Sequence, residues 1–249
     1  MGKTGSGFEV QLPRSLRAER HDDIAVLFLA RPQKRNAIDD PTVFGIEAFF
    51  AAVPDGVRAV VLAGEGDHFC SGLDLSELSA RDAAQGVAHS RSWHRAFEHI
   101  EFGKVPVVAV LHGAVVGGGL EIAAACHIRV AEGSAYYALP EGSRGIFVGG
   151  GGSVRLPRLI GTSRMVDMML TGRSYDAEEG QAIGISHYLV APGEGLAKGI
   201  ELARRIAESD PATGYLTEAL ISAIAQGDDE AKARLKAFLE KRAPKTVRH

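Results

Sequence analysis

Cysteines and long apolar stretches are both scarce in this sequence, and each shortage excludes a class of protein. The 249 residues include only Cys70 and Cys126, which allow at most one disulfide and match no metal-binding spacing. No run of about 18 apolar residues occurs, so we expect no transmembrane helix. Residues 1–6 are small and polar and lack the apolar core of a secretory signal. Together these features favour a reducing, cytoplasmic location.

The sequence also lacks a large excess of either positive or negative charge. The 28 basic and 31 acidic residues leave a net charge of −3, and no basic block occurs. We therefore expect neither nucleic acid nor a membrane as a partner. The nine histidines show no HExxH or paired-ligand spacing, so no metal site is expected. What remains is the composition of an ordinary globular protein, 45% hydrophobic and 24% charged.

Short apolar runs bounded by glycine and proline alternate with helical patterns up to about residue 190. Helices are expected from Asp40, as N-cap before Pro41, to about residue 52, and from about residue 82 to 100. Strands are expected at residues 24–29, 59–62, 105–111 and 128–130, with a further short strand at residues 8–12. This alternation predicts an α/β fold with largely parallel strands.

The pattern changes to consecutive helices in the last part of the chain. Asp176 and Glu179 have the spacing of a capping box, and Gly184 is placed to end that helix. A helix over residues 196–206 has one apolar face, and Asp210 and Asp228 are placed to open two more. We therefore predict an α/β core over residues 1–190 and a helical subdomain over residues 191–249.

The most informative stretch runs from the strand at residues 105–111 to Glu141. Three glycines, residues 117–119, follow the strand, and Glu121 lies in the first turn of the helix that they open. Glycines leave backbone N–H groups open to a ligand, and a helix start adds free donors and a positive dipole end. This combination suits a negative charge that develops during a reaction.

Glu121 and Glu141 allow two interpretations from local chemistry alone. An acid beside an N–H donor can move protons next to an activated carbonyl while the donor holds the enolate oxygen. A second acid would let a water be held between two carboxylates. Alternatively, Glu121 only complements the helix dipole and Glu141 is a solvated turn residue.

The sequence resembles the enoyl-CoA hydratase/isomerase (crotonase) superfamily from about residue 24 to the C-terminal helices. The segments that carry the resemblance, in chain order, are Arg31-Pro-Gln-Lys-Arg-Asn-Ala37, Phe69-Cys-Ser-Gly-Leu-Asp-Leu75, His112-Gly-Ala, Gly117-Gly-Gly-Leu-Glu121, Leu139-Pro-Glu141 and Gly150-Gly-Gly-Ser-Val-Arg-Leu-Pro-Arg158. It implies a crotonase-like α/β spiral of repeated ββα units with a C-terminal helical trimerisation subdomain. It also implies a homotrimer or a dimer of trimers.

The resemblance further implies the roles of individual residues. The N–H groups of Leu73 and Gly118 would form an oxyanion hole, and Glu121 and Glu141 would be the catalytic acids. Trp93 and Phe97 would wall the acyl pocket, although such aromatics are more often plain core. The residues expected to bind the coenzyme A thioester are Lys34, Arg35, Ala37, Ser71, Asp74, Leu75, Gly117 and Pro140.

Two retained glutamates favour hydration of a 2-enoyl-CoA, with the thioester as substrate and no further cofactor. A double-bond isomerase that uses one glutamate is the alternative, and a non-catalytic acyl-CoA-binding subunit is a third. A dinucleotide-binding domain and a serine hydrolase lack their motifs. Departures from the family at His127, Val148 and residues 136–138 leave acyl-group choice open.

Overall fold

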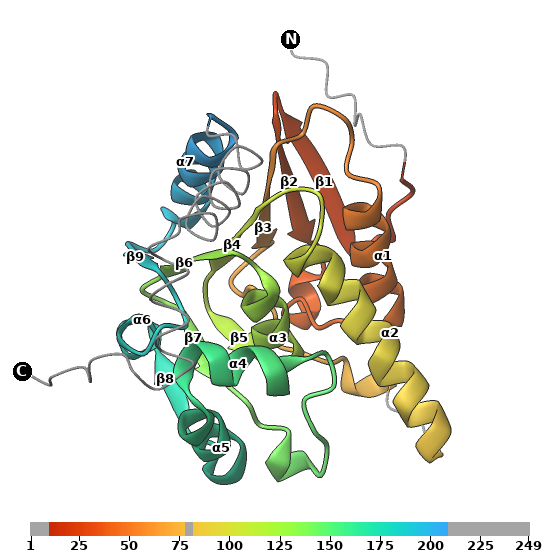
Figure 1. Ribbon diagram of the computed structural model, residues 1–249. Helices are drawn as coiled ribbons and strands as arrows, with labels where there is room; N and C mark the ends of the chain where they lie inside the picture. Colours follow the sequence, from red (N-terminus) through yellow and green to blue (C-terminus); the bar gives the residue numbers. More distant parts are fainter. Residues whose placement is uncertain (1–9, 78–81, 209–249) are drawn as a thin grey trace, which may run out of the picture. The chain divides into compact units, whose positions relative to one another are not determined.

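A computed structural model of the protein describes residues 10–77 and 82–208 (Figure 1). Residues up to Ala207 form one compact unit, and a second unit begins at Glu208. The helices predicted from Asp210 and Asp228 lie outside the described residues, so the domain boundary at residue 190 stays a prediction. Among the described helices, none is long and apolar enough to cross a membrane.

Six strands form the main sheet, in the order β1-β2-β3-β4-β6-β9. All neighbours in it run parallel except β1 and β2, which confirms the predicted largely parallel sheet. A smaller sheet has the order β5-β7-β8. The strands are β1 (Leu16–His21), β2 (Ile24–Leu29), β3 (Ala59–Gly64), β4 (Val107–Leu111), β5 (Ala114–Val116), β6 (Ile128–Glu132), β7 (Tyr136–Ala138), β8 (Ser174–Asp176) and β9 (Tyr188–Val190).

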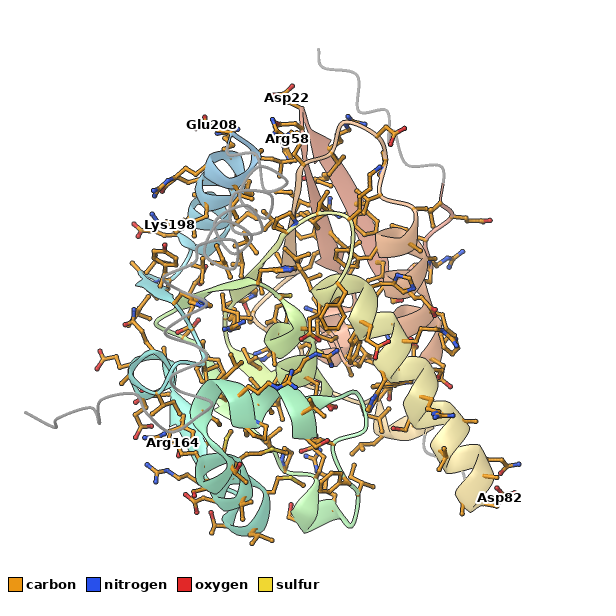
Figure 2. All side chains as sticks on the ribbon, in the orientation of Figure 1. Asp22, Arg58, Asp82, Arg164, Lys198 and Glu208 are labelled. Carbon is orange, nitrogen blue, oxygen red and sulfur yellow. The ribbon has the colours of Figure 1, made fainter. Side chains whose placement is uncertain are left out.

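The first strand is not where the sequence placed it. Residues 10–12 are not in a strand, and β1 instead occupies Leu16–His21, where the sequence analysis placed no strand. As the antiparallel edge strand, β1 keeps half of its surface in solvent, so its polar composition is tolerated. A two-residue turn joins it to β2 at Asp22, labelled in Figure 2, whose φ is 56°.

Seven α-helices and three short 3₁₀-helices lie in the described part of the chain. They are α1 (Asp40–Ala51), α2 (Ala83–Glu101), α3 (Gly118–Ala125), α4 (Gly152–Ile160), α5 (Thr162–Thr171), α6 (Ala177–Ala182), α7 (Gly195–Glu208), η1 (Pro32–Lys34), η2 (Leu75–Glu77) and η3 (Gly142–Arg144). Figure 1 shows α7 (blue) on one side of the main sheet and α1 and α2 (orange and yellow) on the other.

The two faces of the sheet bury alternate residues of the same strands. Leu27 and Leu62 belong to the cluster that includes α1, α2 and α3, whereas Val26 and Val61 pack with Leu202 of α7. Successive side chains of a strand point to opposite faces, and a strand covered on both faces must be apolar throughout. This explains why the central strands read as unbroken apolar runs.

The helices begin at the predicted places, but the N-cap residue predicted for α1 was wrong by one position. Asp39, not Asp40, is the N-cap of α1, and its carboxylate accepts a hydrogen bond from the Thr42 N–H at 2.9 Å. Asp40 is instead the first helical residue. Capping boxes begin α2 at Asp82, labelled in Figure 2, and α6 at Asp176.

The small sheet orients the stretch that carries the acids. Strand β5 leads into Gly117 and α3, and β7, paired with it in parallel, leads into Pro140 and Glu141. The departure at His127 is compensated, because the His127 ring accepts a hydrogen bond from the Val107 N–H at 3.1 Å. Val148 is buried in the core.

Candidate active site

The backbone N–H groups of Leu73 and Gly118 lie close to each other at the start of α3. Gly118 is the first residue of α3, so its N–H has no acceptor within the helix. Gly72 O accepts from the Ile38 N–H and Ile38 O from the Asp74 N–H, both at 2.8 Å. These bonds flank Leu73, whose N–H donates to no acceptor within residues 10–77 and 82–208.

Glycines allow these two donors to approach. A Cβ placed on Gly72 would lie 3.2 Å from the Gly118 nitrogen, and one on Gly118 would lie 3.7 Å from the Leu73 nitrogen. Gly72 also has φ 89°, a conformation that other residues rarely adopt. The structure thus brings together the two residues predicted to form the oxyanion hole.

Glu121 is held one turn into α3 and is almost completely buried. Its Oε1 accepts hydrogen bonds from the N–H groups of Gly150 and Gly152, both at 2.8 Å. Burial, together with the nearby charge of Glu141, raises the pKa of Glu121 to about 7, against the opposing effects of the two N–H donors and Arg155. Near neutral pH this carboxyl is poised to give or take a proton.

Glu141 ends the segment after β7 and is also buried. Burial raises its pKa, although the charge of Arg144 opposes the shift. In the described part of the protein its Oε2 has no hydrogen-bond partner. Gly117 leaves room for this side chain, since a Cβ there would lie 2.5 Å from Glu141 Oε1. A buried polar atom without a partner is costly unless a ligand or water meets it.

Both acids and both donors line a single cavity of about 140 Å³. Its lining residues are Leu73, His89, Ser90, Trp93, Gly118, Glu121, Glu141, Ile146, Phe147 and Gly149. The arrangement can hold an oxyanion on the two N–H groups while two carboxyls handle protons nearby.

The two aromatic residues predicted for the acyl pocket have different positions. Trp93 lines the cavity, and its indole N–H donates to Asp40 Oδ1 at 2.8 Å. Phe97 does not line it; its ring lies behind Gly150, where a Cβ would approach it to 2.5 Å. Phe97 therefore supports the loop that holds Glu121.

A wider groove of about 390 Å³ adjoins the cavity at Leu73, which lines both. It collects six of the eight residues predicted to bind coenzyme A: Lys34, Arg35, Ala37, Ser71, Asp74 and Leu75. The other two, Gly117 and Pro140, lie beside Glu141 instead. Gln33 and Arg144 complete the lining.

Lys34 and Asp74 form an ion pair within this groove. Lys34 Nζ lies 2.8 Å from Asp74 Oδ2, which also accepts from Arg31 at 2.8 Å. Lys34, with Ser76 and Arg31, holds the pKa of Asp74 well below its usual range. Arg35 and Arg144 form no ion pair with any described residue, so they are the cations best placed for a phosphate.

Sequence reasoning missed several of the cavity's residues. His89 and Ser90 lie one turn before Trp93 on α2, and that helical spacing could have indicated them. Ile146 and Phe147 come from a loop without periodic pattern and gave no signal. No cluster of three potential metal ligands occurs among the described residues, and the absence of a metal stays a prediction.

Residues 19–242 match the sequence profile of the family described as enoyl-CoA hydratase/isomerase. The chain belongs to the enoyl-CoA hydratase/isomerase family. The resemblance inferred from the sequence is thus confirmed, and so is the crotonase-like fold, because the family's solved structures share it. The family includes both hydratases and isomerases. Membership alone therefore does not specify which reaction this protein catalyses, and that reaction is inferred from the site.

Three proteins show how far the similarity extends. A crystal structure from Rhodopseudomonas palustris CGA009, assigned as an enoyl-CoA hydratase, is 51% identical with a TM-score of 0.78, covering 92% of this chain and 95% of that one. A Thermobifida fusca YX protein of the same assignment, in complex with CoA, is 25% identical with a TM-score of 0.76, covering 91% of each chain. The enoyl-CoA isomerase/hydratase claC of Penicillium crustosum is 32% identical over 95% of this chain, which spans only 31% of that protein's length.

Proposed function

We propose that this protein is a 2-enoyl-CoA hydratase, which adds water across the 2,3 double bond of an acyl-CoA thioester. The observation that carries the proposal is that two buried glutamates, Glu121 and Glu141, share one cavity with Leu73 and Gly118, the residues of the two N–H donors. The adjoining groove and the CoA bound to the similar Thermobifida protein support an acyl-CoA substrate.

In the proposed reaction the thioester oxygen lies between the N–H groups of Leu73 and Gly118. A water lies between Glu121 and Glu141 Oε2, which has no hydrogen-bond partner in the described part of the protein. One carboxylate takes a proton from the water, whose oxygen bonds to carbon 3, and the other carboxyl delivers a proton to carbon 2. The negative charge that builds on the thioester oxygen is stabilised by the two donors, each worth about 10²–10³ in rate.

The two acids suit these complementary roles because their oxygens are held differently. Glu121 Oε1 is fixed by the N–H groups of Gly150 and Gly152, so this oxygen is held in place while the carboxyl lines the cavity. The pKa of Glu121 is about 7, and Glu141 is a second buried acid in the same cavity. Near neutral pH the two carboxyls can therefore hold one proton between them.

The test is a screen of 2-enoyl- and 3-enoyl-CoA thioesters of several chain lengths, read by product mass. We expect a 3-hydroxyacyl-CoA from the wild type, and its absence at every chain length contradicts a hydratase. Double-bond migration without added water would instead identify the isomerase. Tight thioester binding without any turnover would identify a non-catalytic subunit.

Glu121→Gln and Glu141→Gln test the two-acid mechanism. Each is expected to lower kcat by at least about 10²-fold, since general acid–base groups typically contribute 10²–10⁴-fold. Glu178→Gln, which removes an exposed acid of α6, is the matched control. Full hydration activity in either active-site variant would contradict the mechanism.

The assembly and the location belong to the same proposal. The family resemblance favours a homotrimer or a dimer of trimers, whereas the few cysteines and the small net charge favour a cytoplasmic location without a nucleic-acid or membrane partner. Light scattering of the full chain distinguishes a trimer from a hexamer, and a monomer would contradict this part of the proposal.

A further inference from the structure

Behind the loop that holds Glu121 lies a buried arginine that the proposed reaction does not use. Arg155 projects from the first turn of α4 and is only 7% exposed. Its Nε donates to Glu101 Oε2 at 2.6 Å, and its Nη1 donates to Gly150 O at 3.0 Å. Burying a guanidinium removes its hydration and destabilises the fold unless well-placed partners accept its hydrogen bonds.

These contacts form a continuous chain that ends at the candidate catalytic acid. Glu101, at the end of α2, holds Arg155; Arg155 holds the Gly150 carbonyl; and the Gly150 N–H donates to Glu121 Oε1. Gly152, which supplies the second N–H to Glu121, belongs to the same turn. Gly151 allows the guanidinium to lie across this turn, since a Cβ there would lie within van der Waals overlap of Arg155 Nη1.

We propose that Arg155, anchored by Glu101, is a positioning residue that fixes the turn at residues 150–152 and with it the orientation and charge environment of Glu121. Arg155 lines a separate polar cavity together with Glu101 and Gly151, and it does not line the cavity that holds the acids. It therefore acts through the turn and by its charge. This inference rests on the proposed role of Glu121.

The charges around Glu121 determine the sign of the expected effects. Glu141, from the segment after β7, raises the pKa of Glu121, and Arg155, from α4, lowers it. His89 of α2 lines the same cavity and is paired with Asp40. Removing the Arg155 charge should raise the pKa of Glu121 further, and loosening the two N–H bonds acts in the same direction. Removing only the Glu101 charge leaves Arg155 un-neutralised and should lower it.

The experiment compares Arg155→Met, Arg155→Lys and Glu101→Gln with wild type in the full chain. The readouts are thermal unfolding, kcat and KM on the preferred enoyl-CoA, and the pH profile of kcat/KM. Arg158→Met, an exposed arginine of the same helix, is the control and should match wild type in all three. Arg155→Met should lower kcat by roughly 10- to 100-fold, because a shift of about 1 Å in a catalytic group has that effect.

The pH profile separates positioning from mere structural support. The limb that reports Glu121 should move to higher pH in Arg155→Met, stay near its wild-type position in the charge-retaining Arg155→Lys, and move to lower pH in Glu101→Gln. A folded Arg155→Met with the wild-type limb overturns the proposal. Should Arg155→Met not fold, an unmoved limb in Glu101→Gln overturns it. If Glu121→Gln itself keeps full activity, the proposed function fails instead.

Discussion

Gly152→Ala tests the placement of Glu121 while leaving the glutamate itself in the sequence. A Cβ at Gly152 would lie 2.8 Å from Glu121 Cγ and 2.9 Å from Glu121 Oε1. Ordinary van der Waals contact begins near 3.4 Å, so the Glu121 side chain or the turn must withdraw by about 0.6 Å. Gly152 is the first residue of α4 and does not have a positive φ, so alanine introduces no backbone strain.

The withdrawal should cost activity far more than stability. A displacement of this size predicts a fall in kcat/KM of about 10- to 100-fold. Overpacking by one methyl group costs roughly 1–2 kcal/mol, which corresponds to a fall in Tm of about 2–8 °C for a chain of this size. The limb of the pH profile near neutral pH should also move to higher pH, because weakened hydrogen bonds from the N–H groups lower the pKa of Glu121 less.

The assay is enoyl-CoA hydration followed by product formation, with a thermal unfolding curve of the same sample. Gly86→Ala is the matched control, because a Cβ there meets nothing within 4 Å and the site lies in α2. It should leave kcat/KM unchanged and stabilise the helix by about 0.5–1 kcal/mol. A Gly152→Ala enzyme with wild-type kcat/KM would refute the placement of Glu121 as the acid–base group.

Two further predictions concern pH and the groove. The wild-type profile of kcat/KM should show a limb near pH 7, from the raised pKa of Glu121, and a profile flat between about pH 6 and 8 would contradict it. Asp74→Asn should destabilise the fold by about 3 kcal/mol, the lower end for a buried pair, because Arg31 retains Asp39 and Lys34 is half-exposed. Since the folded-state pKa of Asp74 is depressed, its stabilisation is fully present above the unfolded pKa of about 3.9 and is lost progressively as pH falls from there through the folded-state pKa. Denaturant titrations at pH 7 and near pH 3 measure this, and an equal difference between variant and wild type at both values would contradict it.

The sequence was sufficient for the elements that carry strong local signals. The apolar runs at β2, β3 and β4 were predicted because both of their faces are buried. The capping box at Asp176 begins α6 through a side-chain bond to the Glu179 N–H, so the three-residue spacing reveals it. By contrast, β5, β7 and β8 have three residues each, too few for a period to show.

The site was predictable in its residues but not in its interactions. Glu121, Glu141, Leu73 and Gly118 were placed by the family resemblance, and the structure brings them to one cavity. No local pattern tells that the turn at residues 150–152 donates to Glu121, because the partners are 29 and 31 positions apart.

The ion pair between Lys34 and Asp74 was hidden for the same reason. Forty positions separate the two residues in the chain, and each alone reads as a solvated charge. Contacts of this kind arise only when β2 and β3 bring the loops that follow them to the same edge of the sheet.

The central claim is that Glu121 and Glu141 together add water to a 2-enoyl-CoA. The most direct measurement is turnover of the substrate in ¹⁸O-labelled water by wild type, Glu121→Gln and Glu141→Gln, with the product analysed by mass. The account predicts a labelled 3-hydroxyacyl-CoA from the wild type and almost none from either variant. Labelled product formed at the wild-type rate by either variant, or an unlabelled shifted double bond in every reaction, would contradict it.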